Sequence, residues 1–307
     1  MKVAFFTEMG FSGTIPRTHP NMRTEFAWMC ALNAQHFNIE HAVASTHYME
    51  FPMFDLGIVI IPKKAQNFDI NAFRTLCKQV AVMQEGPSWF WQDYTLEQQV
   101  WYYNTLTSAD IIYTHNKSDK RYYEGLTNHS DVRVMPSLMI EDAIGALPSV
   151  ERNGAIIGGN FVSWYGGFDS YAIAQEFGDE VWAPSMGRKQ QLEDQLVKHL
   201  PYMTWTEWMH ALNRFKYGVH LMRTHAAGTF ALNCAYLGIP CIGYRGLDTQ
   251  QICHPSCTVD VGDLQAARRV AVRLRTDQAF YDQASQECQQ LYKQHYTEET
   301  FKTKFIK

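Results

Sequence analysis

Residues 221–246, LMRTHAAGTFALNCAYLGIPCIGYRG, hold the pattern best suited to chemistry in this chain. A strand-like run leads into the small-residue loop 226–229, which opens a helical pattern closed by Gly238. Small residues such as Gly228 let a ligand approach the backbone, and the free N–H groups of a helix N-terminus attract phosphate. The Thr229 hydroxyl adds a donor. The pattern indicates a phosphate site, with an ordinary strand–turn–helix as the alternative.

Acidic and aromatic residues follow an expected strand in the first half of the chain. Residues 84–89, QEGPSW, lie directly after this strand. A carboxylate at a strand end can take the proton of an attacking hydroxyl group. Glu85 is the first candidate for this general base and Asp93 the second; a strand-end cap and a helix N-terminal acid are the alternatives. Trp89 and Trp91 are candidates for stacking on a sugar or base.

Further polar residues lie where other expected strands end. Glu8 and Gly10 are on the exit loop of the first strand, and His115 ends a later strand. In parallel α/β folds, ligands bind at the carboxyl ends of the strands, so we expect Gly10 to contact the donor and Glu8 and His115 to contact the acceptor. For His115, a structural role is the alternative.

Composition limits the function classes. The chain has 307 residues, a formal net charge of −4 and 46% hydrophobic residues, which excludes disorder. We expect a cytoplasmic protein, because the first residues lack a signal-peptide pattern and no apolar run is long enough to span a membrane. The number of cysteines, seven, is odd, which favours reduced thiols over a disulfide framework. Four common motifs are absent: G-x-G-x-x-G, G-x-x-x-x-G-K-[ST], G-x-S-x-G and D-x-D. Their absence argues, in that order, against a dehydrogenase, a P-loop protein, a hydrolase and a metal-dependent sugar transferase.

Short apolar runs alternate with amphipathic ones, which is typical of an α/β fold with parallel sheets. The alternation restarts after a break near residues 145–154, so two α/β halves are expected. We predict domains at 1–148, 149–285 and a helical tail at 286–307. The expected strands are 3–7, 39–44, 56–61, 79–84, 111–114, 132–134, 155–157, 180–183, 217–222 and 241–244, and the expected helices are 20–30, 68–77, 96–106, 192–200, 204–215, 229–237 and much of the chain from 264 onward.

The segment 221–246 resembles the donor site of GT-B glycosyltransferases, in which a strand, a loop and a helix ending in Gly-x-Pro hold a nucleotide-sugar. The resemblance implies two Rossmann-like domains, an interdomain cleft and a C-terminal helix returning to the first domain. Aligned on Gly238, His225 and Asn233 stand where many retaining members carry two glutamates. By resemblance, Asn233 would contact the ribose and His225 the diphosphate.

The same resemblance assigns two further elements of the second half. The turn at residues 158–160, with Gly159 and Asn160, resembles the loop that approaches the diphosphate. Arg188 and Lys189 resemble the basic pair that neutralises the leaving nucleotide. A solvated surface pair is the alternative. No tightly bound metal is expected, because the Cys-His-Pro-Ser-Cys run at 253–257 lacks a second ligand pair.

The opening segment TEMGFSGTIPRTHPNMRTEFAW resembles the transferases of T-even-like bacteriophages that glycosylate hydroxymethylated DNA bases. This implies transfer of glucose or arabinose from a UDP-sugar to 5-hydroxymethylcytosine in double-stranded DNA, which would protect the DNA from host nucleases in the host cytoplasm. The target base would have to leave the stack. Candidate contacts to DNA phosphates are Arg17, Arg23, Lys63, Lys64, Lys117, Lys120 and Arg121.

Two alternatives remain open at this point. One is a bacterial transferase with a cell-surface glycan or lipid acceptor, although no convincing amphipathic basic helix for a lipid surface is present. The other is a non-catalytic nucleotide- or DNA-binding protein on the same scaffold. Charge does not favour DNA, because residues 1–150 hold 11 Lys and Arg against 15 Asp and Glu.

Overall fold

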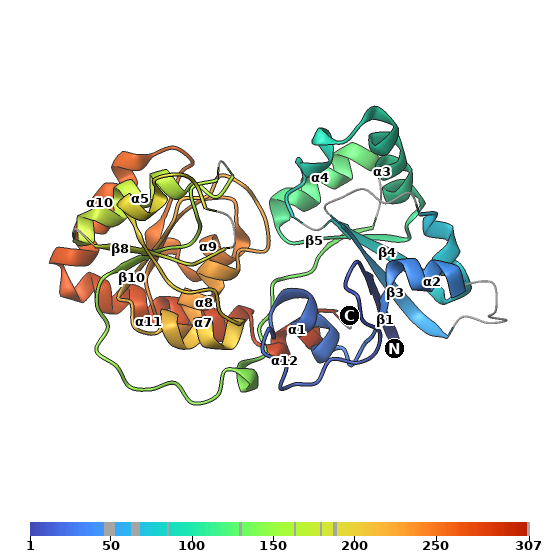
Figure 1. The fold of residues 1–307 in the computed structure, drawn as a ribbon, viewed down its shortest axis with the longest axis horizontal. Helices are drawn as coiled ribbons and strands as arrows, with labels where there is room; N and C mark the ends of the chain where they lie inside the picture. The colour runs from blue at the N-terminus through green and yellow to red at the C-terminus, as the bar shows by residue number, and fades with distance from the viewer. Residues whose placement is uncertain are drawn as a thin grey trace. The chain divides into compact units, whose positions relative to one another are not determined.

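The structure of the chain, a computed structural model, describes residues 1–45, 53–62, 68–84, 86–128, 131–162, 164–178, 180–186 and 189–305. The chain forms two compact units. Unit 1 comprises Met1–His19 and Thr24–Pro136 together with Phe305, and unit 2 comprises Pro20–Arg23 and Ser137–Lys304. Each unit is built on its own parallel sheet (Figure 1).

The sheet of unit 1 has the strand order β2-β1-β3-β4-β5-β6, with every pair parallel. Strands buried on both faces form continuous apolar runs, as in the FDLGIVII segment of β3. The strands are β1 (Val3–Thr7), β2 (Gln35–Asn38), β3 (Phe54–Ile61), β4 (Cys77–Gln84), β5 (Ile111–Thr114) and β6 (Val132–Val134).

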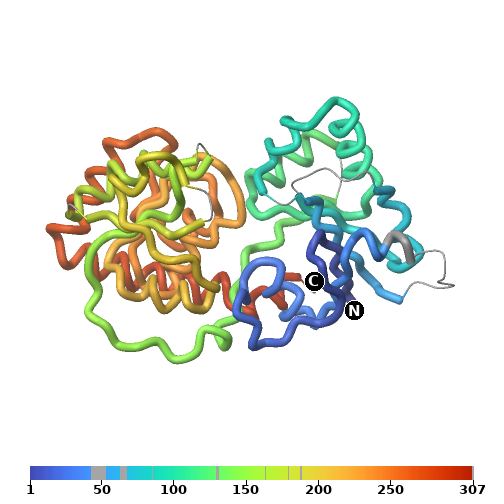
Figure 2. Tube along the Cα trace, in the orientation of Figure 1, coloured from blue at the N-terminus to red at the C-terminus, as the bar shows by residue number. Residues whose placement is uncertain are grey.

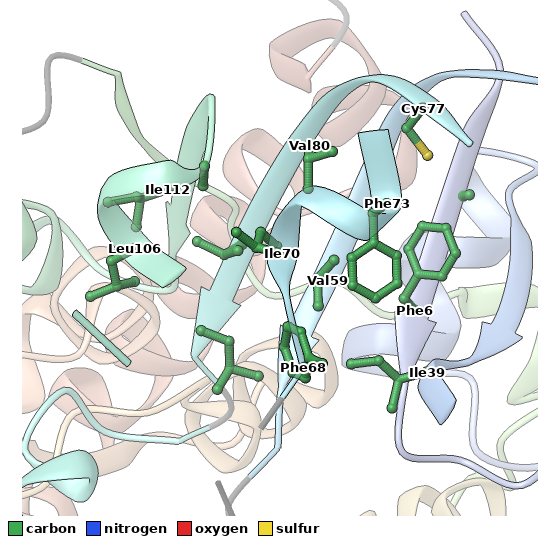
Figure 3. Close-up of a cluster of buried hydrophobic side chains, with 14 of the residues drawn as sticks. Phe6, Ile39, Val59, Phe68, Ile70, Phe73, Cys77, Val80, Leu106 and Ile112 are labelled. Atoms are coloured by element: carbon green, nitrogen blue, oxygen red, sulfur yellow. The ribbon is translucent and has the colours of Figure 1, made fainter. Parts of the chain in front are cut away.

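Helices cover this sheet and close its core. Phe6, Val59 and Val80 point from three strands into one apolar cluster, where Phe73 packs against Phe6 at 4.7 Å between ring centroids (Figure 3). The helices of unit 1 are α1 (Thr24–Ala31), α2 (Ile39–Ser45), α3 (Leu96–Ser108) and α4 (Lys117–Thr127), with 3-10 helices η2 (Ile70–Thr75) and η3 (Phe90–Asp93).

The sheet of unit 2 has the order β12-β11-β10-β7-β8-β9, again entirely parallel. Its first strand in sequence, β7, therefore lies in the middle, and the chain winds outward from it in both directions. The strands are β7 (Ala155–Ile157), β8 (Val181–Ala183), β9 (Lys198–His199), β10 (Tyr217–His220), β11 (Cys241–Tyr244) and β12 (Thr258–Val259).

Alternation along β10 assigns the two faces of this sheet. Tyr217 and Val219 pack with α5 and α10, whereas a Cβ on Gly218 would meet Cys234 of α8 at 3.0 Å. Helices α5 and α10 therefore cover one face and α8 the other (Figure 1). The helices are α5 (Gly167–Ala174), α6 (Glu193–Leu196), α7 (Trp205–Leu212), α8 (Thr229–Leu237), α9 (Asp248–Cys253), α10 (Leu264–Thr276), α11 (Gln278–His295) and α12 (Glu298–Phe305), with η4 (Glu141–Ala143), η5 (Gln175–Phe177) and η6 (Pro255–Cys257).

An extended segment without helix or strand links η4 to β7 (Figure 2). It is tied to the rest of unit 2 by Arg152, whose guanidinium donates to the Asn213 carbonyl at 3.1 Å and to the Asn213 side chain at 2.8 Å. At the end of the chain, Phe305 stacks on Tyr113 at 5.7 Å within unit 1. No helix in the described ranges is long and apolar enough to span a membrane.

The expected strand at residues 39–44 is wrong, because this segment forms helix α2. Asn38 ends β2 and its side-chain oxygen accepts the N–H groups of Glu40 (3.1 Å) and His41 (3.2 Å). These hydrogen bonds cap the first turn of a helix. The strand lies just upstream, in the more polar Gln35–Asn38 segment at the sheet edge.

Four expected helices are shorter than predicted. The helix expected at 20–30 begins only at Thr24, and the one expected at 204–215 ends at Leu212. Residues 68–77 form only the 3-10 helix η2, since Cys77 already belongs to β4. Residues 192–200 form the four-residue α6, after which the chain enters β9. The helices α4, α5 and α9 were not expected from the sequence.

Candidate functional site

The strand order of unit 2 creates a switch point between β7 and β10. From this position the chain connections run in opposite directions, which leaves a crevice at the carboxyl ends of the two strands. The turn that begins at Gly158 follows β7, and residues 221–228 follow β10, so two of the predicted site segments emerge side by side.

The turn after β7 requires glycine because two aromatic rings pack against it. A Cβ on Gly158 would lie 2.5 Å from Cγ of His220 and 2.6 Å from Cδ1 of Phe230. A Cβ on Gly159 would lie 2.9 Å from Cβ of Tyr165. Side chains of this unit therefore fill the space beside both glycines, and only a residue without a Cβ fits this turn.

The start of α5 holds the loop that follows β10. Gly166 caps α5 with a φ of +61°, and a Cβ there would lie 2.1 Å from the Leu221 carbonyl oxygen. The buried Ser170 hydroxyl accepts the Leu221 N–H at 2.9 Å and donates to the Gly166 carbonyl at 2.9 Å. These contacts fix the loop at its first residue.

Two side-chain hydroxyl groups fix the loop at the N-terminus of α8. Gly228 has a φ of +67°, and a Cβ there would lie 2.1 Å from Oγ1 of Thr249. That hydroxyl donates to the Gly228 carbonyl at 2.9 Å, and the Ser137 hydroxyl donates to the Ala227 carbonyl. The first N–H groups of any helix lack intrahelical acceptors, so α8 presents donors beside the half-buried Thr229.

Sequence reasoning missed His220, which ends β10. Its side chain is buried at 6% exposure, and neither ring nitrogen has a hydrogen-bond partner in the described part of the chain. Burial lowers the pKa of His220 to about 4, so the imidazole is neutral at pH 7. A buried polar ring without partners is rare and needs an explanation. Its only sequence signal is a histidine at the end of an otherwise apolar strand.

The two residues aligned with the family's glutamates differ in their surroundings. His225 packs over Gly246, where a Cβ would lie 2.0 Å from its Nε2 atom. Asn233 is 3% exposed, and its amide, oriented to satisfy both neighbours, accepts from Nε1 of Trp208 (2.9 Å) and donates to the Thr229 carbonyl (3.1 Å). A ribose contact by Asn233 would require this buried amide to exchange partners.

A polar cluster lies at the same edge of the sheet, where the strands end. Asp169, in the first turn of α5, accepts from the Tyr244 hydroxyl at 3.1 Å and pairs with Arg223 at 3.3 Å. Burial, and then the Asp169 carboxylate, raise the pKa of Tyr244 to about 12. Arg223 is mostly exposed, so this cluster places a cation on the loop between β10 and α8.

The predicted basic pair follows β8. Arg188 lies outside the described residues, whereas Lys189 is exposed and its ammonium group pairs with the Asp194 carboxylate. Because β7 and β8 are parallel neighbours, Lys189 and Gly158 both follow strands at the same edge of the sheet.

In unit 1, the acidic candidates are only partly described. Glu85 lies outside the described residues. Asp93 is exposed and ends the 3-10 helix η3, rather than opening a helix as the alternative reading supposed. Glu8 and Gly10 are exposed after β1, and a Cβ on Gly10 would meet nothing within 4 Å.

The aromatic candidates of unit 1 pack inward to different degrees. Trp91 stacks on Tyr102 at 5.4 Å and its Nε1 donates to the Tyr122 hydroxyl at 3.1 Å, so it packs on the core. His115 stacks on Trp28 at 5.5 Å, and burial lowers its pKa to about 4. Trp89 is half-buried beside η3.

The basic candidates for an acceptor are distributed over both units, and two of them lie outside the described residues. Arg17 is exposed in unit 1, and its guanidinium lies 4.0 Å from Sγ of Cys30. Arg23 belongs to unit 2, where its backbone bridges to Met139. Lys120 pairs with Glu124 at 2.9 Å, and Lys63 and Lys64 lie outside the described residues.

Within the described ranges, no group of three or more His, Cys, Asp or Glu side chains is arranged to hold a metal ion. All seven cysteines are free thiols, and six of them are buried.

Comparisons with known proteins place this fold. No protein-family model and no curated protein sequence matches the chain. Among solved structures, Anabaena HepE in complex with UDP and glucose matches with a TM-score of 0.70 at 10% identity, covering 100% of this chain and 98% of that one. An alpha-glucosyltransferase in complex with UDP and a 13-mer DNA containing a HMU base matches with a TM-score of 0.62 at 15% identity, with the same coverages.

TarM matches with a TM-score of 0.61 at 7% identity over 82% of this chain, which spans only 54% of TarM. These likenesses, with the two parallel six-stranded sheets, confirm the expected fold class: the chain has the GT-B fold.

Proposed function

We propose that the chain is a glycosyltransferase that uses a UDP-sugar. One observation carries this proposal: at the switch point of unit 2, the glycine turn after β7, the N-terminus of α8 and His220, whose ring has no partner among the described residues, come together at the carboxyl ends of the strands. This arrangement suits a diphosphate, since it offers backbone N–H groups and a helix dipole rather than a metal cage. The complexes of HepE and of the alpha-glucosyltransferase with UDP support UDP as the nucleotide.

Each predicted residue then has a role in the transfer. The N–H groups of α8 and the Thr229 hydroxyl hold the diphosphate, and Arg188 and Lys189 neutralise its charge as the bond from the sugar to UDP breaks. The acceptor oxygen forms the new bond to the sugar, and its proton passes to a carboxylate, with Glu85 first and Asp93 second. UDP leaves with the electrons of the broken bond.

For the acceptor, we propose 5-hydroxymethylcytosine in double-stranded DNA, with glucose or arabinose as the sugar. The supporting observation is the likeness, over nearly the full length of both chains, to an alpha-glucosyltransferase bound to DNA that carries a modified base. Modification of phage DNA in this way would protect it from host nucleases. Because the hydroxymethyl group lies within a duplex, the target base would have to be extruded.

A cell-surface glycan or lipid acceptor is the second candidate. It is supported by the likeness to a TarM variant in complex with fondaparinux, alpha-GlcNAc-glycerol and UDP, which matches with a TM-score of 0.62 at 8% identity. The two candidates share the donor site and differ only in the acceptor, so one assay separates them.

The decisive experiment supplies the proposed DNA acceptor and its unmodified counterpart. The protein is incubated with UDP-glucose or UDP-arabinose and with two DNA duplexes that differ only in hydroxymethylcytosine against cytosine, and the digested nucleosides are weighed. We expect a mass gain of one sugar on hydroxymethylcytosine alone. UDP binding without any mass gain would reject the DNA acceptor and direct the search to glycans. Absence of UDP binding would reject the donor assignment itself.

Variants assign the roles. Arg188→Ala and Lys189→Ala should weaken UDP binding, while Lys198→Ala should not, because Lys198 begins β9 and pairs with Glu180 just before β8, at the amino ends of the strands. Glu85→Gln should abolish transfer and leave UDP affinity intact. Transfer that survives in Glu85→Gln but is lost in Asp93→Asn would move the base to Asp93.

A further inference from the structure

Four side chains form a continuous relay in the segment that follows Lys189. The Glu193 side chain is completely buried; its Oε2 accepts the Gln190 N–H at 2.9 Å, and its Oε1 lies 2.9 Å from Nε2 of His199. On the other side of the imidazole, Nδ1 of His199 lies 3.0 Å from Oδ1 of Asp194. The same Asp194 oxygen pairs with the Lys189 ammonium group.

The geometry links the four side chains in alternating order. Both ring nitrogens of His199 lie within hydrogen-bond distance of a carboxylate oxygen, Nε2 of Glu193 and Nδ1 of Asp194. The carboxyl groups of Glu193 and Asp194 therefore alternate with the His199 imidazole and the Lys189 ammonium group. The hydrogen bond from Lys189 holds the pKa of Asp194 below its usual range.

The two ends of the relay differ in burial. Glu193 is fixed in the interior, and His199 is mostly buried at 14% side-chain exposure in β9. By contrast, Asp194 and Lys189 are 66% and 49% exposed in their side chains, so this pair can separate in water. The buried half therefore fixes the position of Asp194, and the exposed half is an exchangeable contact.

We propose that Asp194 is the counter-ion of Lys189 in the donor-free protein, and that Lys189 exchanges Asp194 for the diphosphate of the donor. This inference rests on the proposed function, because it requires that Lys189 bind that diphosphate. His199 keeps Asp194 paired after the exchange, so no unpaired carboxylate is left beside the incoming phosphate. Glu193, His199 and Asp194 are thus positioning residues that set donor affinity through Lys189.

The exchange predicts a substitution that tightens binding. Asp194→Asn removes the competitor while keeping the side-chain shape, so Lys189 meets UDP without first losing a partner. An exposed ion pair of this kind corresponds to about a two- to fivefold change in the dissociation constant of UDP. The KM for the UDP-sugar should fall by a similar factor, with kcat unaffected. Damage to the local structure would weaken binding instead.

The experiment is a calorimetric titration of the full chain with UDP in a double-mutant cycle. We expect Asp194→Asn to bind about two- to fivefold more tightly than the wild type, and Asp194→Glu to return to the wild-type value. In a Lys189→Ala background, Asp194→Asn should have no effect, because the competition is gone. His199→Gln should weaken UDP binding, since Asp194 then keeps Lys189 more strongly, and Asp194→Asn should reverse that loss.

The outcomes separate this inference from the proposed function. If wild-type protein does not bind UDP, both are overturned. If it binds UDP and Asp194→Asn leaves the affinity unchanged or weaker, the exchange is overturned and the proposed donor site stands. Equal tightening by Asp194→Asn with and without Lys189 would also overturn the exchange, because the effect would not pass through that residue.

Discussion

Gly228 is the residue on which the shape of the predicted phosphate loop depends. Alanine at Gly228 would meet both a left-handed backbone and a Cβ position 2.1 Å from Oγ1 of Thr249. Gly262 provides a matched control, because its φ is +86° and nothing lies within 4 Å of its Cβ position. We expect Gly262→Ala to lower the free energy of unfolding by about 1–2 kcal/mol.

Gly228→Ala should lower the free energy of unfolding further than Gly262→Ala and weaken UDP binding at least about tenfold, corresponding to about 1.4 kcal/mol. Urea unfolding and UDP titration of both variants measure the two effects. Equal losses of stability, with UDP affinity intact in both, would show that the Thr249 contact and the loop shape do not matter.

His220 and His254 are two buried histidines with opposite hydrogen-bond status. Both nitrogens of His220 lack partners in the described part of the chain. His254 accepts the Cys241 N–H at 3.3 Å and donates from Nε2 to the Ala231 carbonyl at 2.9 Å. Removing a hydrogen-bonded side chain leaves its buried partner without a hydrogen bond, which lowers the free energy of unfolding by about 1–3 kcal/mol for each partner.

We therefore expect His254→Leu to lower the free energy of unfolding by about 1–3 kcal/mol or more. His220→Leu should leave the free energy of unfolding equal or higher and weaken UDP binding. Residues that serve a binding site often reduce stability, so replacing them stabilises the protein and impairs function. Thermal unfolding and UDP titration test both. Loss of stability in His220→Leu with unchanged UDP affinity would give His220 a purely structural role.

At the residue scale, features set by nearby residues could be predicted from the sequence, whereas features set by tertiary contacts could not. Gly238 has a φ of +70° at the end of α8, as its position before Ile-Pro indicated. The Thr-x-x-Glu pattern at residues 204–207 is a helix-start signal, and it forms a capping box at α7. By contrast, the inward packing of Trp91 and the burial of Asn233 depend on neighbours far away in the sequence. No pattern within a few residues reports such neighbours.

Among the elements, α7 depends on its first turn. The Thr204 hydroxyl accepts the Glu207 N–H at 3.4 Å, and the Glu207 carboxylate accepts the Thr204 N–H at 2.8 Å. Thr204→Ala should lower the free energy of unfolding by about 0.5–2 kcal/mol, whereas Thr204→Ser keeps the hydroxyl and should lose less. Urea unfolding compares the two. Equal losses would mean that the hydroxyl does not stabilise α7.

The strands were predicted better than the helices because buried parallel strands are short apolar runs. The expected bounds of β1, β5, β6, β7 and β11 agree with the structure. The helix at Ile39–Ser45 was missed because its β-branched residues resemble a strand, while the Asn38 cap acts only once β2 is in place. Strand order could not be predicted either, since periodicity does not say which strands are neighbours.

For the whole molecule, buried neutral histidines predict how stability depends on pH. Their folded-state pKa values are about 4, below the ordinary value of 6.5, so the unfolded chain binds more protons between these limits. Stability is therefore complete above about pH 6.5 and falls as the pH drops toward 4. Burial is the largest cause for each of these histidines: His36, His115, His220 and His254.

Each such histidine contributes a slope of up to about 1.4 kcal/mol per pH unit within this window. Urea unfolding at pH 7, 6 and 5 should show this decline in the free energy of unfolding. His220→Leu removes one of the titrating groups, so its decline should be less steep by the contribution of one histidine. A free energy of unfolding that is constant from pH 7 to 5 would contradict the neutral burial of these rings.

The charge of the whole chain bears on the proposed DNA acceptor. With a formal net charge of −4, the protein has no general attraction for DNA, so binding must come from a few local cations. The logarithm of DNA affinity should then fall only shallowly with the logarithm of salt concentration, by about 0.9 per phosphate contacted.

Arg17 is the sharpest test of these local contacts. It is exposed on the loop between β1 and α1, where its guanidinium lies 4.0 Å from Sγ of Cys30. Arg214 is the matched control, because it precedes β10, at the amino ends of the strands of unit 2. If Arg17 contacts a phosphate, Arg17→Ala should weaken DNA binding and reduce the salt slope by about 0.9, while Arg214→Ala changes neither. Fluorescence anisotropy with hydroxymethylcytosine duplexes at several salt concentrations measures both. Weaker binding with an unchanged slope would mean that Arg17 acts on the fold of its loop and not on DNA.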